Sequence, residues 1–170
     1  MAHLTIDFFS NCLRRTVQFQ MIIPGDFCNT WQIEQKRKGK RMKTLFLLHG
    51  YTGAAENWVP DNLSTLYNFA IVMPSGENGF WVDGPATGHQ YGAFIGEELP
   101  DYIRKTFGLA MNPEETYIMG LSMGGFGALH TALQYPETFG KVAALSSALI
   151  IHEIAHMQPG GSNEVANYEY

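Results

Sequence analysis

Four short apolar runs, separated by helical patterns, constrain the fold of this chain more than any other feature. The runs cover residues 44–48, 70–74, 116–119 and 141–145. Continuous apolar runs of this length are typical of strands that are buried on both faces of a parallel sheet. Because helical segments alternate with these strands, the sequence predicts an α/β fold, with a mostly parallel sheet and right-handed crossovers.

The remaining patterns add an N-terminal strand pair and two helices. Residues 16–24 alternate apolar and polar side chains, which predicts a half-buried antiparallel strand, with residues 4–9 as its candidate partner. Apolar residues at helical spacing predict helices over residues 91–107 and 124–135. Together the patterns predict a mostly parallel sheet with N-terminal antiparallel strands and helices on both faces.

Each expected helix has a distinctive sequence feature. Pro100 lies inside the first helix, where its ring and its missing N–H predict a kink or a restart. Gly96, four residues earlier, is small enough to soften the clash with the proline ring. In the second helix, Phe126, Leu129 and Leu133 fall at helical spacing.

The composition fits one globular domain and excludes several functions. With 45% hydrophobic and 16% charged residues, the 170-residue chain is neither disordered nor collagen-like nor a coiled coil, so we expect one domain over residues 1–170. A net charge of −5 provides no overall field for nucleic acid or an anionic membrane. Two cysteines are too few for a disulfide scaffold, and neither a signal peptide nor a spanning segment is visible. These features predict a cytoplasmic protein.

Six of the eleven basic residues gather near residue 40. They are Lys36, Arg37, Lys38, Lys40, Arg41 and Lys43. Such a cluster is compatible with a nuclear address or an RNA-binding patch. No aromatic residues interleave with the charges, as stacking on bases would require, so we interpret the cluster as a solvated hairpin loop around Gly39.

The motif G-x-S-x-G at residues 120–124 carries the strongest functional signal. It follows the apolar run 116–119 and leads into an expected helix, as a nucleophile elbow requires. A serine on such a sharp turn has a strained backbone, and the flanking glycines leave room for the close packing around it. Ser122 is therefore the predicted nucleophile toward an acyl carbonyl, and the Met123 N–H is predicted to bind the resulting oxyanion.

A glycine-rich turn after the first apolar run is predicted to supply the second oxyanion donor. Residues 49–53, with the sequence His-Gly-Tyr-Thr-Gly, follow the buried strand directly. In this arrangement the Tyr51 N–H is the expected donor. The His49 side chain is interpreted as a buried histidine that is bonded to the backbone, because the loop acts through an N–H.

Several motifs together resemble the esterase D group of the α/β-hydrolase superfamily. They are Leu47-Leu48-His49-Gly50, Val72-Met73-Pro74-Ser75, Tyr91 with the segment 94–100, the segment 120–129, and Tyr135-Pro136-Glu137. That group contains S-formylglutathione hydrolases, tributyrin and acetyl esterases, and relatives of feruloyl esterases. The resemblance implies the α/β-hydrolase fold and a serine esterase of short acyl esters or thioesters, which works through an acyl-enzyme with no cofactor and no metal.

The acid and the base that a serine nucleophile needs are not found after Ser122. No aspartate follows it, and the later histidines are His130, His152 and His156. His130 lies about 12 Å along the axis of the expected helix, at about 1.5 Å per residue, and so points away from Ser122. In the family both partners follow later strands. The resemblance therefore implies that they lie beyond Tyr170, that the chain matches the N-terminal two thirds of such an enzyme, and that these 170 residues alone are nearly inert.

Two other functions are left open as alternatives. His152, Glu153 and His156 match H-E-x-x-H, which on a helix places two histidines on one face to bind zinc, with the glutamate as the base of a peptidase. The segment 159–161, Pro-Gly-Gly, ends such a helix within about two turns. An exposed loop or short helix with solvated histidines is the simpler interpretation. The other alternative is a catalytically dead remnant that binds esters.

Three aromatic residues are candidates for the substrate pocket. Trp58, Trp81 and Tyr91 lie near loops at the carboxyl ends of the strands, where ligands bind in such sheets. A position in the hydrophobic core is an equal alternative for each of them. The expected partner is a small-molecule ester or thioester, nucleic acid and membrane are not expected as partners, and a homodimer is left open.

Overall fold

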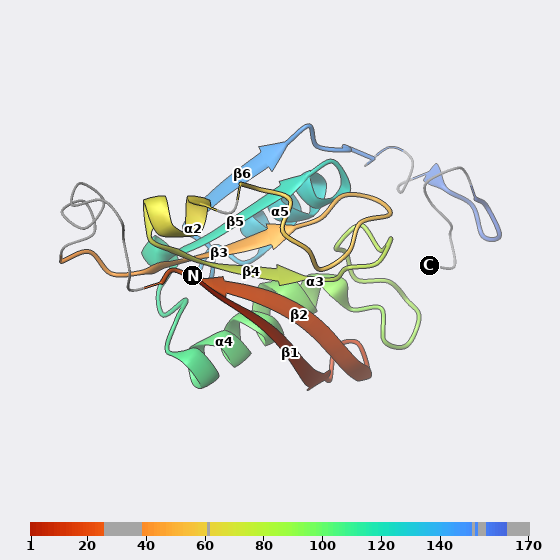
Figure 1. The fold of residues 1–170 in the computed structure, drawn as a ribbon. Helices are drawn as coiled ribbons and strands as arrows, with labels where there is room; N and C mark the ends of the chain where they lie inside the picture. Colours follow the sequence, from red (N-terminus) through yellow and green to blue (C-terminus); the bar gives the residue numbers. More distant parts are fainter. Residues whose placement is uncertain (26–38, 61, 151, 153–155, 163–170) are drawn as a thin grey trace.

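The computed structural model describes residues 1–25, 39–60, 62–150, 152 and 156–162. Figure 1 shows one twisted sheet with helices packed beside it. Six strands follow one another across this sheet in the order β1-β2-β4-β3-β5-β6. They are β1 (Ala2–Ser10), β2 (Arg15–Ile23), β3 (Lys43–Leu48), β4 (Phe69–Pro74), β5 (Thr116–Leu121) and β6 (Lys141–Leu145).

The N-terminal strands β1 and β2 form an antiparallel pair at one edge of the sheet, as the patterns of residues 4–9 and 16–24 predict. Strand β2 also pairs antiparallel with β4. Along β2, Phe19 and Met21 are fully buried whereas Gln18 is exposed. The alternation of side chains therefore follows the period of two that places successive residues on opposite faces of a strand.

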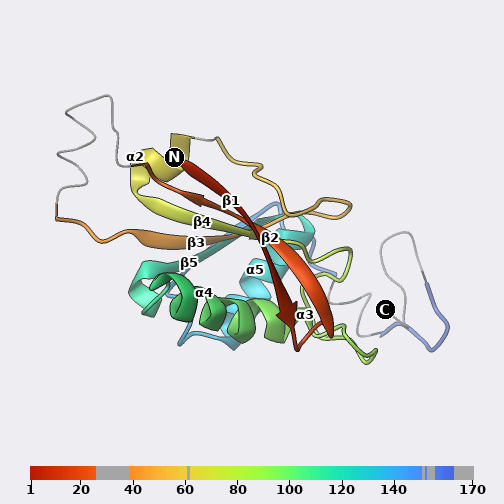
Figure 2. The ribbon, with the colours of Figure 1, turned by 60° about the horizontal axis from the view of Figure 1, so that its bottom comes forward.

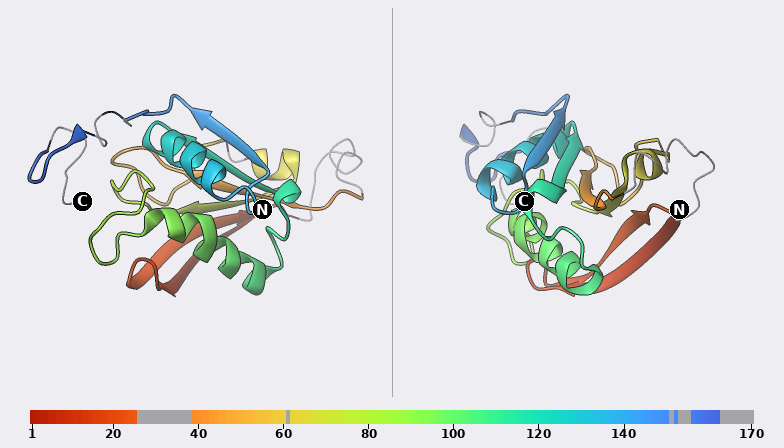
Figure 3. Two further views of the ribbon diagram at one scale, coloured as in Figure 1. Left: turned by 180° about the vertical axis from the view of Figure 1, so that it is seen from behind. Right: turned by 90° about the vertical axis from the view of Figure 1, so that its left-hand side faces the viewer.

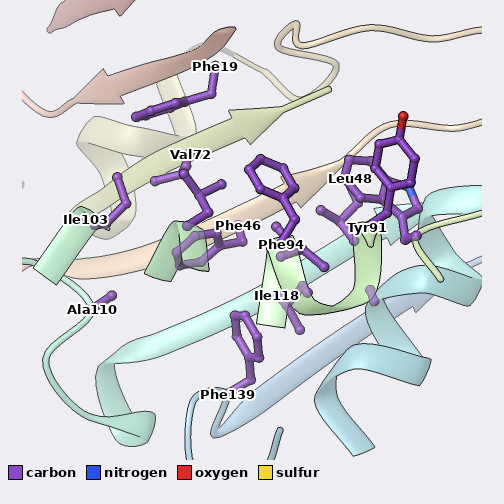
Figure 4. Close-up of a cluster of buried hydrophobic side chains, with 14 of the residues drawn as sticks. Phe19, Phe46, Leu48, Val72, Tyr91, Phe94, Ile103, Ala110, Ile118 and Phe139 are labelled. Atoms are coloured by element: carbon purple, nitrogen blue, oxygen red, sulfur yellow. The ribbon is translucent and has the colours of Figure 1, made fainter. Parts of the chain in front are cut away.

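Strands β3 to β6 form the predicted parallel part of the sheet, with β3 between β4 and β5. The side chains of β3, β4 and β5 divide between two buried clusters on opposite faces. In β3, Phe46 and Leu48 belong to the larger cluster and Leu47 to the smaller one. Figure 4 shows the larger cluster, in which Phe46 lies with Phe94 and Ile118. The central strands are thus buried on both faces, as their continuous apolar runs predict. The run 141–145 forms the strand β6 as predicted, but the prediction that it is buried on both faces is wrong, because β6 lies at the edge of the sheet and all of its residues are exposed.

Helices cover both faces of the sheet (Figures 2 and 3). Helices α4 (Leu99–Phe107) and α5 (Met123–Gln134) lie over the larger cluster. On the other face, the short helix α2 (Asn62–Tyr67) packs through Leu63 against the smaller cluster. Helical periodicity did not predict α2, because six residues are too few to establish a pattern. Within the described ranges, no helix is both long and apolar enough to span a bilayer.

The helix predicted over residues 91–107 forms as three consecutive segments. They are α3 (Tyr91–Ala93), the π-helical segment η1 (Phe94–Glu98) and α4. The wider π turn ends just before Pro100, which confirms the interruption expected there. Gly96 has a contact that the sequence did not reveal, because a Cβ at this position would lie 2.3 Å from the ring of Tyr135.

The second predicted helix forms as α5, but its buried face differs from the predicted stripe. Phe126 is buried and Leu129 is partly buried, whereas Leu133 is 75% exposed. Small residues replace it in the interface: a Cβ at Gly127 would lie 2.5 Å from Trp81. The helix approaches its neighbours through small side chains, so the spacing of its large apolar residues indicated the wrong face near its end.

The basic cluster lies only partly within the described residues. Arg41 pairs with Glu115 at 3.8 Å, and the Lys43 ammonium lies 5.3 Å from the centre of the Tyr117 ring. Residues 36–38 and most of the expected hairpin loop lie outside the described ranges. The interpretation of the cluster as a solvated loop therefore stays a prediction.

Candidate active site

Ser122 occupies a sharp turn between strand β5 and helix α5. Its φ of 55° and ψ of −114° lie in a region that residues with a side chain rarely adopt. Close packing explains the flanking glycines, because a Cβ at Gly120 would lie 1.9 Å from the Gly124 carbonyl oxygen. A Cβ at Gly124 would lie 2.3 Å from the Leu48 carbonyl oxygen. We call this strand-to-helix turn at residues 120–124 the elbow, after the motif that predicted it.

Backbone hydrogen bonds hold this elbow from both sides. The Ser122 N–H donates to the Leu145 carbonyl at 2.9 Å. The Ser122 carbonyl accepts from the N–H groups of Phe126 and Ala148, each at 3.0 Å. The strained turn is therefore fixed by α5, by the end of β6 and by the segment that follows it, so that the serine is held in position before any substrate binds.

The turn formed by residues 49–53 lies against the elbow. A Cβ at Gly50 would lie 3.3 Å from the Leu121 carbonyl oxygen and 3.6 Å from the Ser122 Cβ. The turn is closed by the Gly53 N–H, which donates to the Gly50 carbonyl at 3.0 Å. The structure thus brings together the two glycine-rich segments that the sequence singles out separately.

The His49 side chain is buried and bonded to backbone at both ring nitrogens, as predicted. Its Nδ1 lies 2.8 Å from the Gly50 carbonyl oxygen, and the Gly76 N–H donates to its Nε2 at 3.0 Å. These partners assign the neutral tautomer with the proton on Nδ1. Burial lowers the pKa of His49 below its ordinary value of 6.5, although the bond to Gly50 and the charge of Glu56 act in the opposite direction.

The N–H groups around the nucleophile differ in whether they already have acceptors. The Thr52 N–H donates to the Asn78 side-chain oxygen at 2.9 Å. In the part of the chain that the structure describes, the N–H groups of Tyr51 and Met123 donate to no acceptor. The two predicted oxyanion donors are therefore uncommitted, and they belong to the two segments that meet at Ser122.

The three aromatic pocket candidates occupy buried or partly buried positions. Trp81 and Tyr91 belong to the larger buried cluster, with 0% and 1% exposure, which is the core position that the sequence left open for them beside a place in the pocket. Their polar atoms are used internally: Trp81 Nε1 donates to the His49 carbonyl at 3.3 Å, and the Tyr91 hydroxyl donates to Glu77 at 2.8 Å. Trp58 packs on the smaller cluster. The core alternative holds for Trp81 and Tyr91 because their large rings fill the interior beside the loops.

The three histidines that follow Ser122 in the sequence take no part in the elbow interactions described above. His130 is exposed on α5, where its ring stacks on Phe126 with 5.9 Å between centroids. The rings of His152 and His156 lie 4.4 Å apart, and Glu153 of the H-E-x-x-H motif lies outside the described residues. Among the described side chains, no three of the histidine, cysteine, aspartate or glutamate type are arranged to hold a metal ion.

The role of the loop that follows strand β4 was not predicted from the sequence. In this loop, Asn78 accepts the bond from Thr52, and Glu77 bonds to Tyr91 and to Arg15. The local sequence signals, Gly76 and the pair Asn78-Gly79, favour a turn but do not indicate its contacts. The partners of Glu77 and Asn78 come from distant parts of the chain, so no local pattern could have identified them.

Comparison with known proteins places this chain in a family. The family model described as "Putative esterase" matches residues 10–159, which is most of the chain. The chain belongs to the esterase family. An acetyl esterase of Caldicellulosiruptor saccharolyticus is 38% identical to this esterase-family chain over 174 residues. That alignment covers 100% of this chain and 65% of the acetyl esterase, so the chain spans less than two thirds of its relative's length.

Solved structures share the fold of this esterase-family chain. FphF, a fluorophosphonate-binding serine hydrolase of Staphylococcus aureus, matches with a TM-score of 0.78 and 23% identity over 99% of this chain and 64% of its own. The S-formylglutathione hydrolase FrmB of the same species matches with a TM-score of 0.72 and 24% identity, over 92% and 61%. These likenesses confirm the α/β-hydrolase fold that the sequence motifs implied.

Proposed function

We propose that the protein is a carboxylic ester hydrolase that forms an acyl-enzyme on Ser122. The observation that carries this proposal is the strained elbow at Ser122, where the turn of residues 49–53 packs against it and each of the two segments contains an uncommitted N–H. Ser122 Oγ attacks the acyl carbonyl carbon, and the N–H groups of Met123 and Tyr51 donate hydrogen bonds to the oxyanion that develops. The N-terminus of α5 adds a partial positive charge at the same place.

The proposed reaction also needs a general base to take the proton from Ser122 Oγ. Among the described residues, no hydrogen bond joins this oxygen to a histidine or a carboxylate. His49 is committed to backbone partners at both nitrogens, and His130 is exposed on α5. We therefore propose that the histidine and the acid of the triad come from outside the described residues, as the order of the triad in this fold implies.

The proposed substrates are esters with a short acyl group, with acetyl esters first. The support is the relative that is named an acetyl esterase and is 38% identical over the whole chain. Thioesters are the second substrate class, because a structural neighbour is named as an S-formylglutathione hydrolase. The proposed chemistry uses a triad, of which Ser122 is the nucleophile, and two N–H groups that bind the oxyanion. It requires no cofactor.

Turnover of p-nitrophenyl acetate by the full-length protein tests the proposal. We expect Ser122→Ala to lower kcat by about 10⁴-fold or more, because the acyl-enzyme can no longer form. Ser162→Ala, a matched change at an exposed serine, is expected to leave kcat unchanged. We also expect p-nitrophenyl octanoate to be a poorer substrate than the acetate. Unaltered turnover in Ser122→Ala would refute the proposed nucleophile.

A further inference from the structure

The turn that carries the Tyr51 N–H is held by the loop after strand β4. Two contacts join them: the Gly76 N–H donates to the His49 ring at 3.0 Å, and the Thr52 N–H donates to the Asn78 carboxamide oxygen at 2.9 Å. Thr52 has a φ of 63°, a conformation that is uncommon for residues other than glycine. The conformation of the turn therefore depends on partners outside it.

Two consecutive peptide planes around Tyr51 are fixed in this way. The Gly50 carbonyl and the Tyr51 N–H belong to one trans peptide unit, so they point in opposite directions. His49 Nδ1 and the Gly53 N–H both bond to that carbonyl, at 2.8 and 3.0 Å, and thereby set the direction of the Tyr51 N–H. The next plane contains the Thr52 N–H, which Asn78 holds.

The loop that supplies Asn78 is itself anchored to the core. A Cβ at Gly76 would lie 2.7 Å from the buried ring of Trp81. The Glu77 carboxylate bonds to Arg15 and accepts the Tyr91 hydroxyl at 2.8 Å. Gly76 and Glu77, which precede Asn78, therefore contact the buried side chains of Trp81 and Tyr91. These contacts hold the Asn78 carboxamide in place against the turn of residues 49–53.

We propose that Asn78 and His49 are positioning residues, which hold the peptide planes on either side of Tyr51 and thereby aim its N–H at the substrate oxyanion. The inference rests on the proposed ester hydrolysis at Ser122. Asn78 is the better residue to test because its side chain is exposed, so its replacement leaves the core intact, whereas His49 is buried.

Two substitutions at Asn78 distinguish the effect of losing the hydrogen-bond acceptor from the effect of changing the size of the side chain. Asn78→Leu has a similar volume and no acceptor, and we expect it to lower kcat for p-nitrophenyl acetate at least about tenfold while KM stays within about twofold. Asn78→Asp restores an acceptor oxygen, and we expect its kcat to stay within about threefold of the wild type. Gln18→Ala, which removes one exposed carboxamide bonded to Asp7, is the matched control and should be neutral.

Binding of a boronic acid supplies a second measurement, because its tetrahedral adduct with a serine resembles the transition state. We expect Asn78→Leu to weaken this binding by about the factor by which kcat falls, with a melting temperature like that of the wild type. If Asn78→Leu does not fold, Asn78→Ser, which is too short to reach the Thr52 N–H, replaces it. A folded variant without the acceptor that has wild-type kcat and boronate affinity overturns the inference, provided that Ser122→Ala is inactive. Activity in Ser122→Ala would instead contradict the proposed function itself.

Discussion

At the scale of single residues, the site contains a backbone conformation and a buried titratable side chain that are each unfavourable in isolation and are stabilised by their neighbours. The backbone of Ser122 is in a conformation that costs on the order of 1–3 kcal/mol. Hydrogen bonds from Phe126 and Ala148 and the bond to Leu145 hold it there. His49 is buried as a neutral imidazole although it is a titratable group. Both residues were predicted from sequence because each belongs to a local motif.

The burial of His49 predicts how stability depends on pH. Its pKa in the folded protein is lowered, chiefly by burial, below the 6.5 that it has when exposed. As the pH falls below this value, the unfolded chain binds a proton that the folded chain does not, so the free energy of unfolding decreases. We expect urea unfolding to show a larger loss of stability between about pH 8 and pH 5 in the wild type than in His49→Gln.

The substitution His49→Gln leaves the other ionisable groups in place, so the difference between the two pH profiles reports on position 49. Glutamine cannot gain a proton in this range, so its contribution to the free energy of unfolding is independent of pH. Parallel pH profiles for the two proteins would show that His49 is not the group responsible.

Residues whose roles depend on distant contacts could not be predicted in this way. Asn78 lies in a loop with no periodicity, and its partner Thr52 is 26 positions away. Trp81 and Tyr91 were placed near the carboxyl ends of strands correctly, but the sequence could not tell whether their rings face the core or a pocket. In the structure both rings are buried in the core, where burial of such large rings stabilises the fold.

At the scale of elements, the π-helical segment η1 bonds to the turn between strands β1 and β2, in addition to the pairing of β2 with β4. Glu98, its last residue, accepts hydrogen bonds from the Ser10 hydroxyl and from the N–H groups of Asn11 and Cys12. These donors lie at or just after the end of β1, where the chain turns into β2. Ser10 is fully buried, so its hydroxyl cannot turn to water instead.

We therefore expect Glu98→Ala to lower the free energy of unfolding by about 2–3 kcal/mol, because it leaves a buried hydroxyl and backbone N–H groups without their acceptor. Glu97→Ala makes the same chemical change one residue earlier, at an exposed position, and is expected to cost no more than about 0.5 kcal/mol. Chemical denaturation of the two variants measures the difference. Equal losses would mean that the contacts of Glu98 contribute nothing beyond helix propensity.

Helices and strands were predicted best where the spacing of apolar residues along the sequence follows one simple pattern. The buried strands β3, β4 and β5 followed from continuous apolar runs, and β2 from alternation. The run 141–145 predicted the strand β6 but not its exposure at the edge of the sheet. Prediction failed for the outer turn of α5, where Leu133 is exposed and Gly127 packs instead. A glycine contributes to an interface by letting two backbones approach closely, and this contribution is invisible to any measure of apolar periodicity.

At the scale of the whole molecule, the order of strands explains why the site forms at the carboxyl ends of β3 and β5. These strands are parallel neighbours, so the turn after β3 and the elbow after β5 meet at the same edge of the sheet. Local motifs predicted each segment, and the parallel pairing of Leu48 with Gly120 brings them together.

The central claim is that Ser122 is the nucleophile, and covalent labelling of the full-length protein tests it most directly. Incubation with a fluorophosphonate, followed by proteolysis and mass spectrometry, locates the phosphonylated residue. We predict a single modification on Ser122, with loss of ester turnover in proportion to labelling, because only an activated serine at an oxyanion site reacts in this way. A protein that turns over esters while its label lies on another residue, or while Ser122 stays unmodified, would contradict the account.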